Sequence, residues 1–181
     1  MEKYTEKQLQ QMLQEPSQRR KAFECIVRKY TPQLYWLIRR MIYSHDDADD
    51  VLQNTFLKAW SNLNSFRGES KLSTWLYRIA TNEALSFLQH KRETLTLDSP
   101  EASILNTLEC DPYFDGDQTQ KMLQQALATL PDKQRIVFNL KYYEEMKYEE
   151  MSQILDTSVG ALKASYHFAV QKIEAFFQER D

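Results

Sequence analysis

The sequence predicts an all-α protein in which two small helical domains are joined by an acidic linker. Three observations support this fold class. Only 3 glycines occur among 181 residues, and sheet-rich chains need more turn residues than that. Apolar residues recur at helical spacing in residues 1–92 and again in residues 119–181. Between these segments, residues 93–118 lack the periodicity and contain Pro100 and Pro112, as expected of a linker.

The first predicted domain, residues 1–92, is expected to be a bundle of helices around one apolar core. A short helical pattern occupies Thr5–Pro16, and an amphipathic stripe follows over Ala22–Tyr30. Thr31-Pro32 predicts the start of a separate helix, because proline is favoured at the first helical position.

Two further helices complete this predicted bundle. Ser44 is suited to cap the first of them, and aspartates crowd its first turn, where the helix dipole favours anions. The apolar stripe of Ala48–Trp60 is predicted to face the core. An irregular stretch around Gly68, Asn62–Lys71, then precedes a long helix through Leu72–Leu88.

Charge is distributed unevenly along the chain. Residues 1–92 carry 15 Lys and Arg against 10 Asp and Glu, whereas residues 93–118 carry seven acidic residues and no basic one. Residues 119–181 are nearly neutral, with 8 basic and 9 acidic residues. A basic block, an acidic tether and a neutral block indicate segments with different partners. The longest apolar run, Tyr35–Ile38, is far shorter than the ~20 residues of a membrane span, so we expect a cytoplasmic protein.

The C-terminal segment predicts a helix-turn-helix. Met122–Leu130 has an apolar helical face, and Pro131-Asp132 marks the start of a second helix. A short helix over Tyr148–Leu155 is then separated by Asp156–Ser158 from a longer helix over Val159–Glu174. This layout consists of a short helix, a three-residue turn and a longer capped helix. In DNA-binding proteins it places the second helix in a groove of the DNA.

Two separated segments resemble the sigma-70 family of RNA polymerase sigma factors, in its extracytoplasmic function (ECF) subfamily. The first segment comprises Asp46–Trp60 and its continuation Phe66–Asn82. The second runs from Leu130 to Lys172 and includes Ser158–Ser165, which resembles the start of the family's recognition helix. The resemblance implies a protein that binds core RNA polymerase, melts promoter DNA and directs transcription initiation.

The resemblance assigns a polymerase-binding role to the helix over Asp46–Trp60. Its side chains off the apolar stripe are free to face a partner. The alternative is a solvated acidic helix start that the helix dipole stabilises. The implied contacts to core polymerase are Asp49, Asp50, Gln53, Asn54 and Leu57.

The resemblance also implies that the irregular loop and the following helix bind the −10 promoter element as a single strand. Single-strand binding needs aromatic faces for stacking, polar groups for an extruded base and cations for phosphates. Trp75 fits the apolar stripe and is predicted to be core, and a plain polar face stays open for Arg78 and Asn82. The candidates are Phe66, Arg67, Ser70 and Lys71 in the loop and Tyr77, Arg78, Thr81 and Asn82 on the helix.

The helix after Asp156 is implied to lie in the major groove of the −35 element. This chain departs from the family there, because arginine is common at the positions of Ser165, Phe168 and Val170. Asp156 stands where glycine is usual. Arginine forks to guanine are therefore absent from this helix. We expect phosphate contacts, apolar contacts and DNA shape to carry binding. The candidates are Ser158, Gly160, Ala161, Lys163, Ser165, His167 and Lys172.

The sequence indicates a non-enzyme without cofactor or metal. Cys25 and Cys110 are too few for a disulfide framework or a Cys-based zinc site, and the three histidines are far apart in sequence. The resemblance implies an anti-sigma partner, often membrane-anchored in the family. Two alternatives stay open: a helix-turn-helix regulator acting without polymerase, and an adaptor made of two helical modules.

Overall fold

The computed structural model describes residues 4–94 and 117–180. Every regular element in these two ranges is helical, which confirms the all-α fold class. We call α1–α4 the N-terminal domain and α6–α9 the C-terminal domain. The N-terminal domain consists of α1 (Glu6–Gln14), α2 (Arg19–Ile42), α3 (His45–Ser61), a 3-10 turn η1 (Leu63–Ser65) and α4 (Leu72–Thr94). The C-terminal domain consists of α6 (Gln118–Ala128), α7 (Asp132–Tyr142), α8 (Tyr148–Leu155) and α9 (Val159–Gln178).

The predicted linker falls almost wholly outside the described residues. Only its ends are described: Glu93 lies in the last turn of α4 and Gln118 opens α6. Asp117 caps that helix, since its side chain accepts a hydrogen bond of 2.8 Å from the backbone amide of Gln120.

The predicted helix break at Thr31-Pro32 is wrong, because α2 runs unbroken through Pro32. Proline lacks an amide hydrogen, and its ring clashes with the carbonyl one turn earlier, which together cost about 3 kcal/mol in a helix interior. Thr31 donates its hydroxyl to the carbonyl oxygen of Val27 at 2.7 Å. Buried side chains lie on both sides of the proline, and their burial in one shared core outweighs the local penalty. They include Ile26, Tyr30, Leu34, Leu37 and Ile38.

Side chains cap the first and third helices. Thr5, where the predicted helical pattern begins, forms a reciprocal capping box with Gln8 at the start of α1. The N-cap predicted at Ser44 is confirmed. The hydroxyl of Ser44 accepts from the amide of Asp47 at 3.3 Å at the start of α3. The apolar stripe of α3 is buried up to Ala59, but Trp60 is 44 % exposed. The prediction that Trp60 is core is therefore wrong: its ring packs against Phe23 at the edge of the core, with centroids 5.0 Å apart.

The helix-turn-helix is formed by α8 and α9. Asp156 lies between them with φ 50° and ψ 46°, so an aspartate adopts the left-handed conformation that glycine usually supplies. Ser158 caps α9 by accepting a hydrogen bond of 3.3 Å from the amide of Ala161. The helix runs to Gln178, one turn beyond the predicted end.

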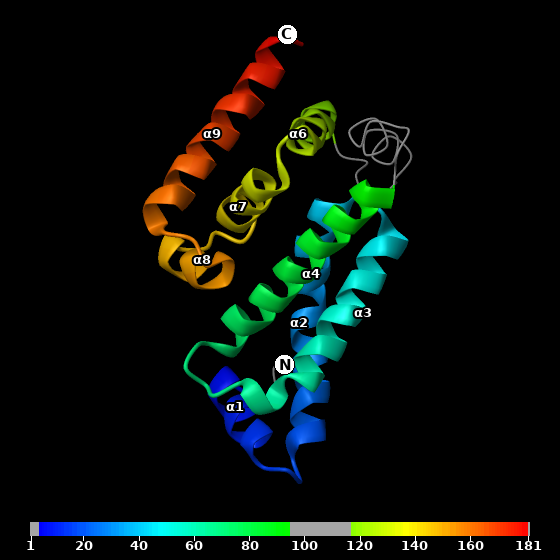
Figure 1. The fold of residues 1–181 in the computed structure, drawn as a ribbon, viewed down its shortest axis with the longest axis vertical. Helices are drawn as coiled ribbons and strands as arrows, with labels where there is room; N and C mark the ends of the chain where they lie inside the picture. Colours follow the sequence, from blue (N-terminus) through cyan, green and yellow to red (C-terminus); the bar gives the residue numbers. More distant parts are fainter. Residues whose placement is uncertain (1–3, 95–116, 181) are drawn as a thin grey trace.

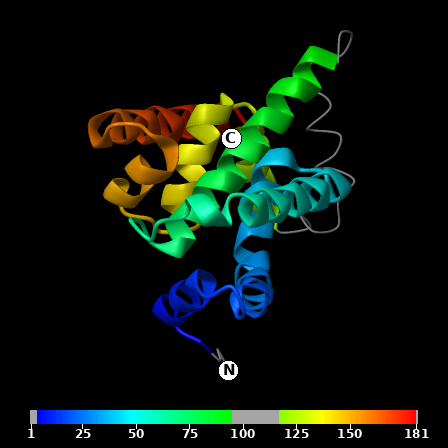
Figure 2. The same cartoon turned by 60° about the horizontal axis from the view of Figure 1, so that its bottom comes forward.

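The two domains pack directly against each other. In Figure 1, α4 lies between α2 and α3 on one side and the C-terminal helices on the other, and Figure 2 shows the same neighbours from another side. Contacts join α4 to α8 and α2 to α7. One buried apolar cluster includes Leu72 and Leu76 of α4 together with Leu140 and Met151 of the C-terminal domain. The core of the N-terminal domain therefore continues across the domain boundary.

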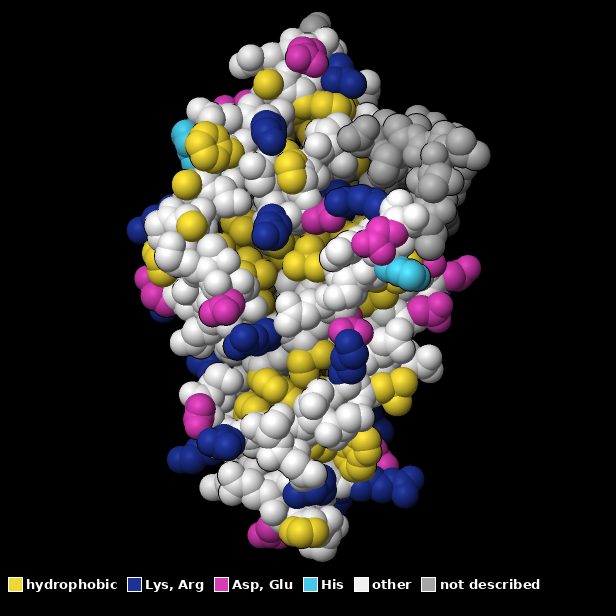
Figure 3. All heavy atoms as spheres, viewed as in Figure 1, with side chains coloured by type: hydrophobic (Ala, Val, Ile, Leu, Met, Phe, Trp, Pro, Cys, Tyr) yellow, Lys and Arg dark blue, Asp and Glu magenta, His cyan; other side chains and the backbone are white. Residues whose placement is uncertain are grey.

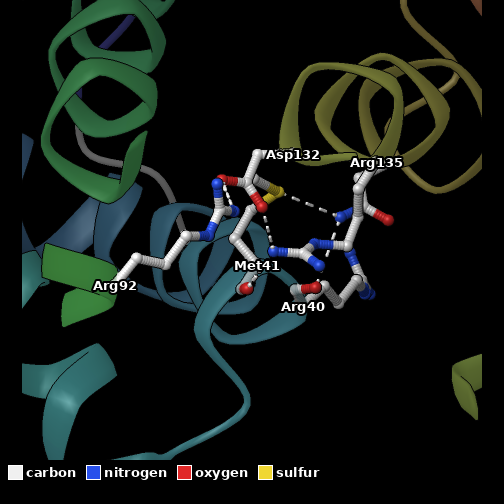
Figure 4. A network of polar contacts seen from close by, with 6 residues as sticks. Arg40, Met41, Arg92, Asp132 and Arg135 are labelled. Atoms are coloured by element: carbon white, nitrogen blue, oxygen red, sulfur yellow. Dashed lines mark hydrogen bonds and ion pairs between the residues drawn. The ribbon is translucent and has the colours of Figure 1, made fainter. Parts of the chain in front are cut away.

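A polar network also crosses this boundary. The guanidinium of Arg135, 1 % exposed, donates to the Asp132 carboxylate at 2.8 Å and to the carbonyl oxygen of Met41 at 3.1 Å (Figure 4). Arg92 of α4 binds the other oxygen of Asp132. Asp132 of α7 therefore bridges one arginine from each domain (Figure 4).

Candidate polymerase and DNA interface

One face of α3 carries the five residues predicted to bind polymerase. Asp49, Asp50, Gln53, Asn54 and Leu57 are all exposed, and Leu57 is 59 % exposed. The opposite face of α3, including Val51 and Phe56, is buried in the core. The structure thus presents an acidic helix start followed by an uncovered leucine, with the exposed Trp60 less than one turn beyond. Such an apolar centre with a polar rim is typical of a protein-binding face.

The loop between α3 and α4 forms one wall of a pocket of about 400 Å³. Its conformation depends on Gly68, whose φ of 73° is the left-handed region that side chains with a Cβ disfavour. The other wall is α1, which the sequence analysis did not include in the site. Figure 3 shows basic side chains around the end of the molecule that carries α1. The lining includes Lys7, Gln10, Gln14, Arg19, Asn64 and Arg67.

Hydrogen bonds hold the two walls of this pocket together. Arg19 donates to the backbone oxygen of Leu13 at 3.1 Å and to the side-chain oxygen of Asn64 at 3.0 Å. Gln10 reaches the backbone oxygen of Ser70 at 3.5 Å. A signal for this wall existed in the sequence, because Lys7, Gln10 and Gln14 recur at helical spacing beside the face that carries the buried Leu9 and Leu13.

The four predicted loop residues differ in their exposure. Arg67 and Lys71 are exposed, whereas Phe66 and Ser70 are half-buried. The Phe66 ring packs on Trp75 with centroids 4.9 Å apart. Trp75, predicted to be core, is partly buried and packs against the core. The loop therefore offers cations at its surface and one aromatic ring anchored to α4.

The four candidates on α4 divide between two faces of the helix. Arg78 and Asn82 are exposed one turn apart, so both are available to a ligand. Tyr77 is 5 % exposed and Thr81 is fully buried. Burial is the first cause that raises the pKa of Tyr77, followed by the neighbouring charge of Glu144. Contact of Tyr77 or Thr81 with DNA requires this face to be uncovered, and their DNA-binding role stays a prediction.

Two carboxylates of the C-terminal domain contact two of the candidate −10 residues. Tyr77 donates its hydroxyl to Glu144 at 2.9 Å. The other oxygen of Glu144 pairs with Arg40 of α2 at 3.1 Å. Lys71 pairs with Glu150 of α8 at 2.7 Å. This hydrogen bond is the main cause that raises the pKa of Lys71 and lowers the pKa of Glu150.

The outer face of α9 is the candidate −35 surface. Gly160, Ala161, Lys163 and His167 are exposed, and Ser165 is half-buried. A Cβ added at Gly160 would meet nothing within 4 Å, so this part of the helix is open to a close partner.

Three side chains modify the predicted −35 surface. Ser158 is exposed, but its hydroxyl is engaged in the helix cap. Lys172 is exposed and donates to Gln134 of α7 at 3.0 Å. Phe168, which the sequence analysis recorded only as a departure from the family, is 52 % exposed beside His167. Phe168 lies on the same helix as the exposed Ala161. Exposed apolar side chains of this kind suit contact with thymine methyl groups.

Within the described ranges, no three or more His, Cys, Asp and Glu side chains converge where they could hold a metal ion. None of the helices described there is long and apolar enough to cross a bilayer. His45 instead lies within 2.7 Å of the Tyr35 hydroxyl and 3.5 Å from Asp49.

Comparison with known proteins identifies the family. Residues 26–94 match the model described as Sigma-70 region 2, and residues 120–173 match the one described as Sigma-70, region 4. The ECF RNA polymerase sigma factor SigW of Bacillus subtilis is 34 % identical over 156 residues, covering 81 % of this chain and 83 % of that protein.

Two solved structures share the fold. The sigma factor RpoE from Bartonella quintana, in complex with the anti-sigma factor NepR, matches with a TM-score of 0.70 at 23 % identity. The match covers 87 % of this chain and 98 % of the RpoE chain. CnrH in complex with the cytosolic domain of CnrY matches with a TM-score of 0.70 at 21 % identity, covering 96 % of each chain.

The two helical domains, with a helix-turn-helix in the second, and the two family matches define a member of the sigma-70 family. Within that family the chain belongs to the ECF RNA polymerase sigma factors, and it functions as an RNA polymerase sigma factor.

Proposed function

We propose that this sigma factor recruits core polymerase through the exposed face of α3 and contacts its promoter at two separate surfaces. The pocket between α1 and the loop is the observation that carries this proposal. A regulator that binds only duplex DNA through α9 has no use for a cationic, amide-lined pocket at the far end of the other domain.

The pocket suits one unpaired nucleotide of the melted −10 element. Its volume of about 400 Å³ accommodates a base with part of its sugar. Amides of Gln10, Gln14 and Asn64 offer both donors and acceptors to a base edge. Lys7 and Arg67 supply cations for the flanking phosphates. We assign the continuation of the strand to the exposed pair on α4, Arg78 and Asn82.

The −35 surface on α9 combines few cations with apolar contacts. Lys163 and Lys172 are its lysines, and phosphate neutralisation governs most of the affinity for duplex DNA. We therefore assign Lys163 to a phosphate and assign Ala161 and Phe168 to the thymine-methyl edge of the major groove. Weak binding at this surface becomes effective when the polymerase complex tethers it to the −10 surface.

We further propose that the chain is a non-enzyme that acts in the cytoplasm, where polymerase and promoter are present. It directs catalysis that polymerase performs. An anti-sigma protein is the proposed regulatory partner. One of the two similar structures is a complex with the anti-sigma factor NepR, and the other is a complex with the cytosolic domain of CnrY.

A transcription assay with Arg67→Ala tests the pocket. Core polymerase and the chain are incubated with genomic fragments of the source organism, and transcripts are mapped at increasing salt. Removing one phosphate contact should lower the salt slope of promoter binding by about one and reduce specific transcripts. Arg20→Ala is the matched control, because Arg20 is an exposed arginine on α2 that does not line the pocket and pairs with Glu24 one turn along.

The result is informative in either direction. Reduced transcription with Arg67→Ala, together with normal transcription by Arg20→Ala, supports the pocket. Equal behaviour of both variants removes the pocket from the DNA-binding site.

A further inference from the structure

A second pocket adjoins the pocket between α1 and the loop. It has a volume of about 310 Å³ and lies where α1 meets the start of α2. Figure 1 and Figure 2 both show α1 beside the start of α2 at one end of the molecule. The exposed Gln11 lines both pockets, so the two are neighbours along α1. The other residues that line the second pocket are Tyr4, Gln8, Met12, Glu15 and Gln18.

Tyr4 and Met12 give the second pocket aromatic and apolar surface. Both side chains are half-buried and pack against the core of the N-terminal domain, so the core holds them in place. Their exposed sides are available to a ligand. A base stacks favourably on an aromatic ring, and a thioether is a soft neighbour for such a ring. No lysine or arginine is among the described residues that line this pocket, so it suits a base better than a phosphate.

Hydrogen bonds within the second pocket determine which polar atoms remain for a ligand. The Oε1 atom of Gln8 accepts from the backbone amide of Thr5 at 2.8 Å, which leaves the Nε2 group of Gln8 as a donor. Gln18 donates its Nε2 group to Glu15, which leaves the Oε1 atom of Gln18 as an acceptor. The second carboxylate oxygen of Glu15 is a further acceptor. The pocket therefore combines one oriented amide donor with acceptors, of which Glu15 is charged.

Guanine matches these groups better than the other bases do. Its edge carries two neighbouring donors, the N1 hydrogen and the N2 amino group, beside the O6 acceptor. A carboxylate such as Glu15 accepts from both donors at once, and its charge strengthens these hydrogen bonds. The amide donor of Gln8 then suits O6. Adenine and cytosine present an amino group next to an unprotonated ring nitrogen, which a carboxylate repels, and thymine has no amino group.

We propose that the second pocket binds a guanine base of the melted strand, next to the nucleotide held in the first pocket. Lys7 supports a continuous path for the strand, because it is exposed, lines the first pocket and lies one turn before the shared Gln11. It supplies a cation for the phosphate that joins the two nucleotides. The inference rests on the proposed function, which assigns the first pocket to one nucleotide of that strand.

Selection of single-stranded DNA by the complete complex tests the guanine preference. The full chain with core polymerase is mixed with a random-sequence pool of short single-stranded DNA, and the bound fraction is sequenced. The wild type should enrich a motif with guanine at one fixed position, about tenfold over the other bases. Glu15→Gln should lower this enrichment to about twofold or less, because the amide lacks the charge and one acceptor. Glu24→Gln, at an exposed glutamate of α2 that lines neither pocket, is the matched control and should select as the wild type does.

Two variants of Tyr4 test the stacking separately. Tyr4→Ala should lower the guanine enrichment severalfold, whereas Tyr4→Phe should retain it, because a phenyl ring keeps the stacking face. Lys7→Ala should reduce the amount of bound DNA without changing the preferred base, since a phosphate contact carries no sequence information.

A guanine enrichment that Glu15→Gln leaves unchanged would overturn the inference. A selected motif without any fixed guanine would overturn it as well. In both cases the selected motif would still support the proposed function, so the two failures are distinguishable. Selection of no motif by the wild-type complex would overturn the inference and the proposed function together.

Discussion

Arg135 of α7 donates a hydrogen bond of 3.1 Å to the backbone carbonyl oxygen of Met41, which ties the C-terminal domain to the end of α2 (Figure 4). The same guanidinium binds Asp132 and lies over the ring of Tyr43, 5.5 Å from its centroid. A buried arginine with these partners links α7 to the end of α2 through one side chain.

Removing this arginine should destabilise the whole chain. Arg135→Ala leaves the carbonyl of Met41 without this donor and empties a buried volume, which should lower the free energy of unfolding by about 3–5 kcal/mol. Urea unfolding followed by circular dichroism measures it, with the exposed Lys133→Ala as control. A loss below about 1 kcal/mol would show that the network contributes little.

Tyr43 should make stability depend on pH in the alkaline range. Burial raises its pKa to about 12, although the nearby Arg135 acts in the opposite direction. The raised pKa favours the neutral folded form, so this contribution is fully present below about pH 10 and is lost as pH rises towards 12. It amounts to about 2–3 kcal/mol.

The variant Tyr43→Phe removes that titration. Urea midpoints measured from pH 9 to above pH 11 should fall less steeply for Tyr43→Phe than for the wild type. Tyr142→Phe, at a tyrosine that is 52 % exposed, is the matched control. Parallel curves for wild type and Tyr43→Phe would show that this tyrosine is not the source.

The turn of the helix-turn-helix should gain stability from glycine. Asp156 has φ 50°, where a Cβ is unfavourable, and Asp156→Gly relieves this at the cost of a more flexible unfolded chain. We expect a gain of about 0.5–1 kcal/mol, measured as a higher melting temperature. Asp156→Val, which is β-branched, should be destabilising. A lower melting temperature for Asp156→Gly would indicate that the aspartate side chain stabilises the turn.

Polymerase binding should be sensitive to the outer face of α3. Asp50→Lys and Leu57→Asp change exposed side chains, so each should alter stability by no more than about 0.5 kcal/mol. Each should nevertheless weaken binding to core polymerase by about fivefold or more. Glu24→Lys, an equal charge reversal on the exposed face of α2, is the control in the same pull-down titration. Unchanged binding by both α3 variants would mean that polymerase docks elsewhere.

Features governed by neighbouring residues were predictable from the sequence. Ser44 and Ser158 cap helices through bonds to residues three positions away, so short motifs suffice to find them. The exposed face of the candidates on α3 followed from helical periodicity, whereas the candidates on α9 followed from the resemblance to the family. The break at Thr31-Pro32 was wrong because packing of distant residues against α2 overrides the local preference of proline.

Features that join distant residues were not predictable. Glu144 contacts Tyr77 across 67 positions and Arg40 across 104, and no local pattern marks such a pair. For this reason the sequence could not reveal that Tyr77 and Thr81 are buried. It also could not show that α1 forms one wall of the pocket beside the loop, although the polar spacing on α1 was visible.

Promoter opening measured with and without core polymerase tests the central claim most directly. Permanganate reacts with unpaired thymines, so a mapped promoter of the source organism reports melting of the −10 element. We predict reactivity only when the full chain and core polymerase are both present. Sequence-specific DNA binding by the chain alone, with no melting when polymerase is added, would indicate a regulator that acts without polymerase. Neither binding nor melting under any condition would indicate an adaptor and would contradict the account.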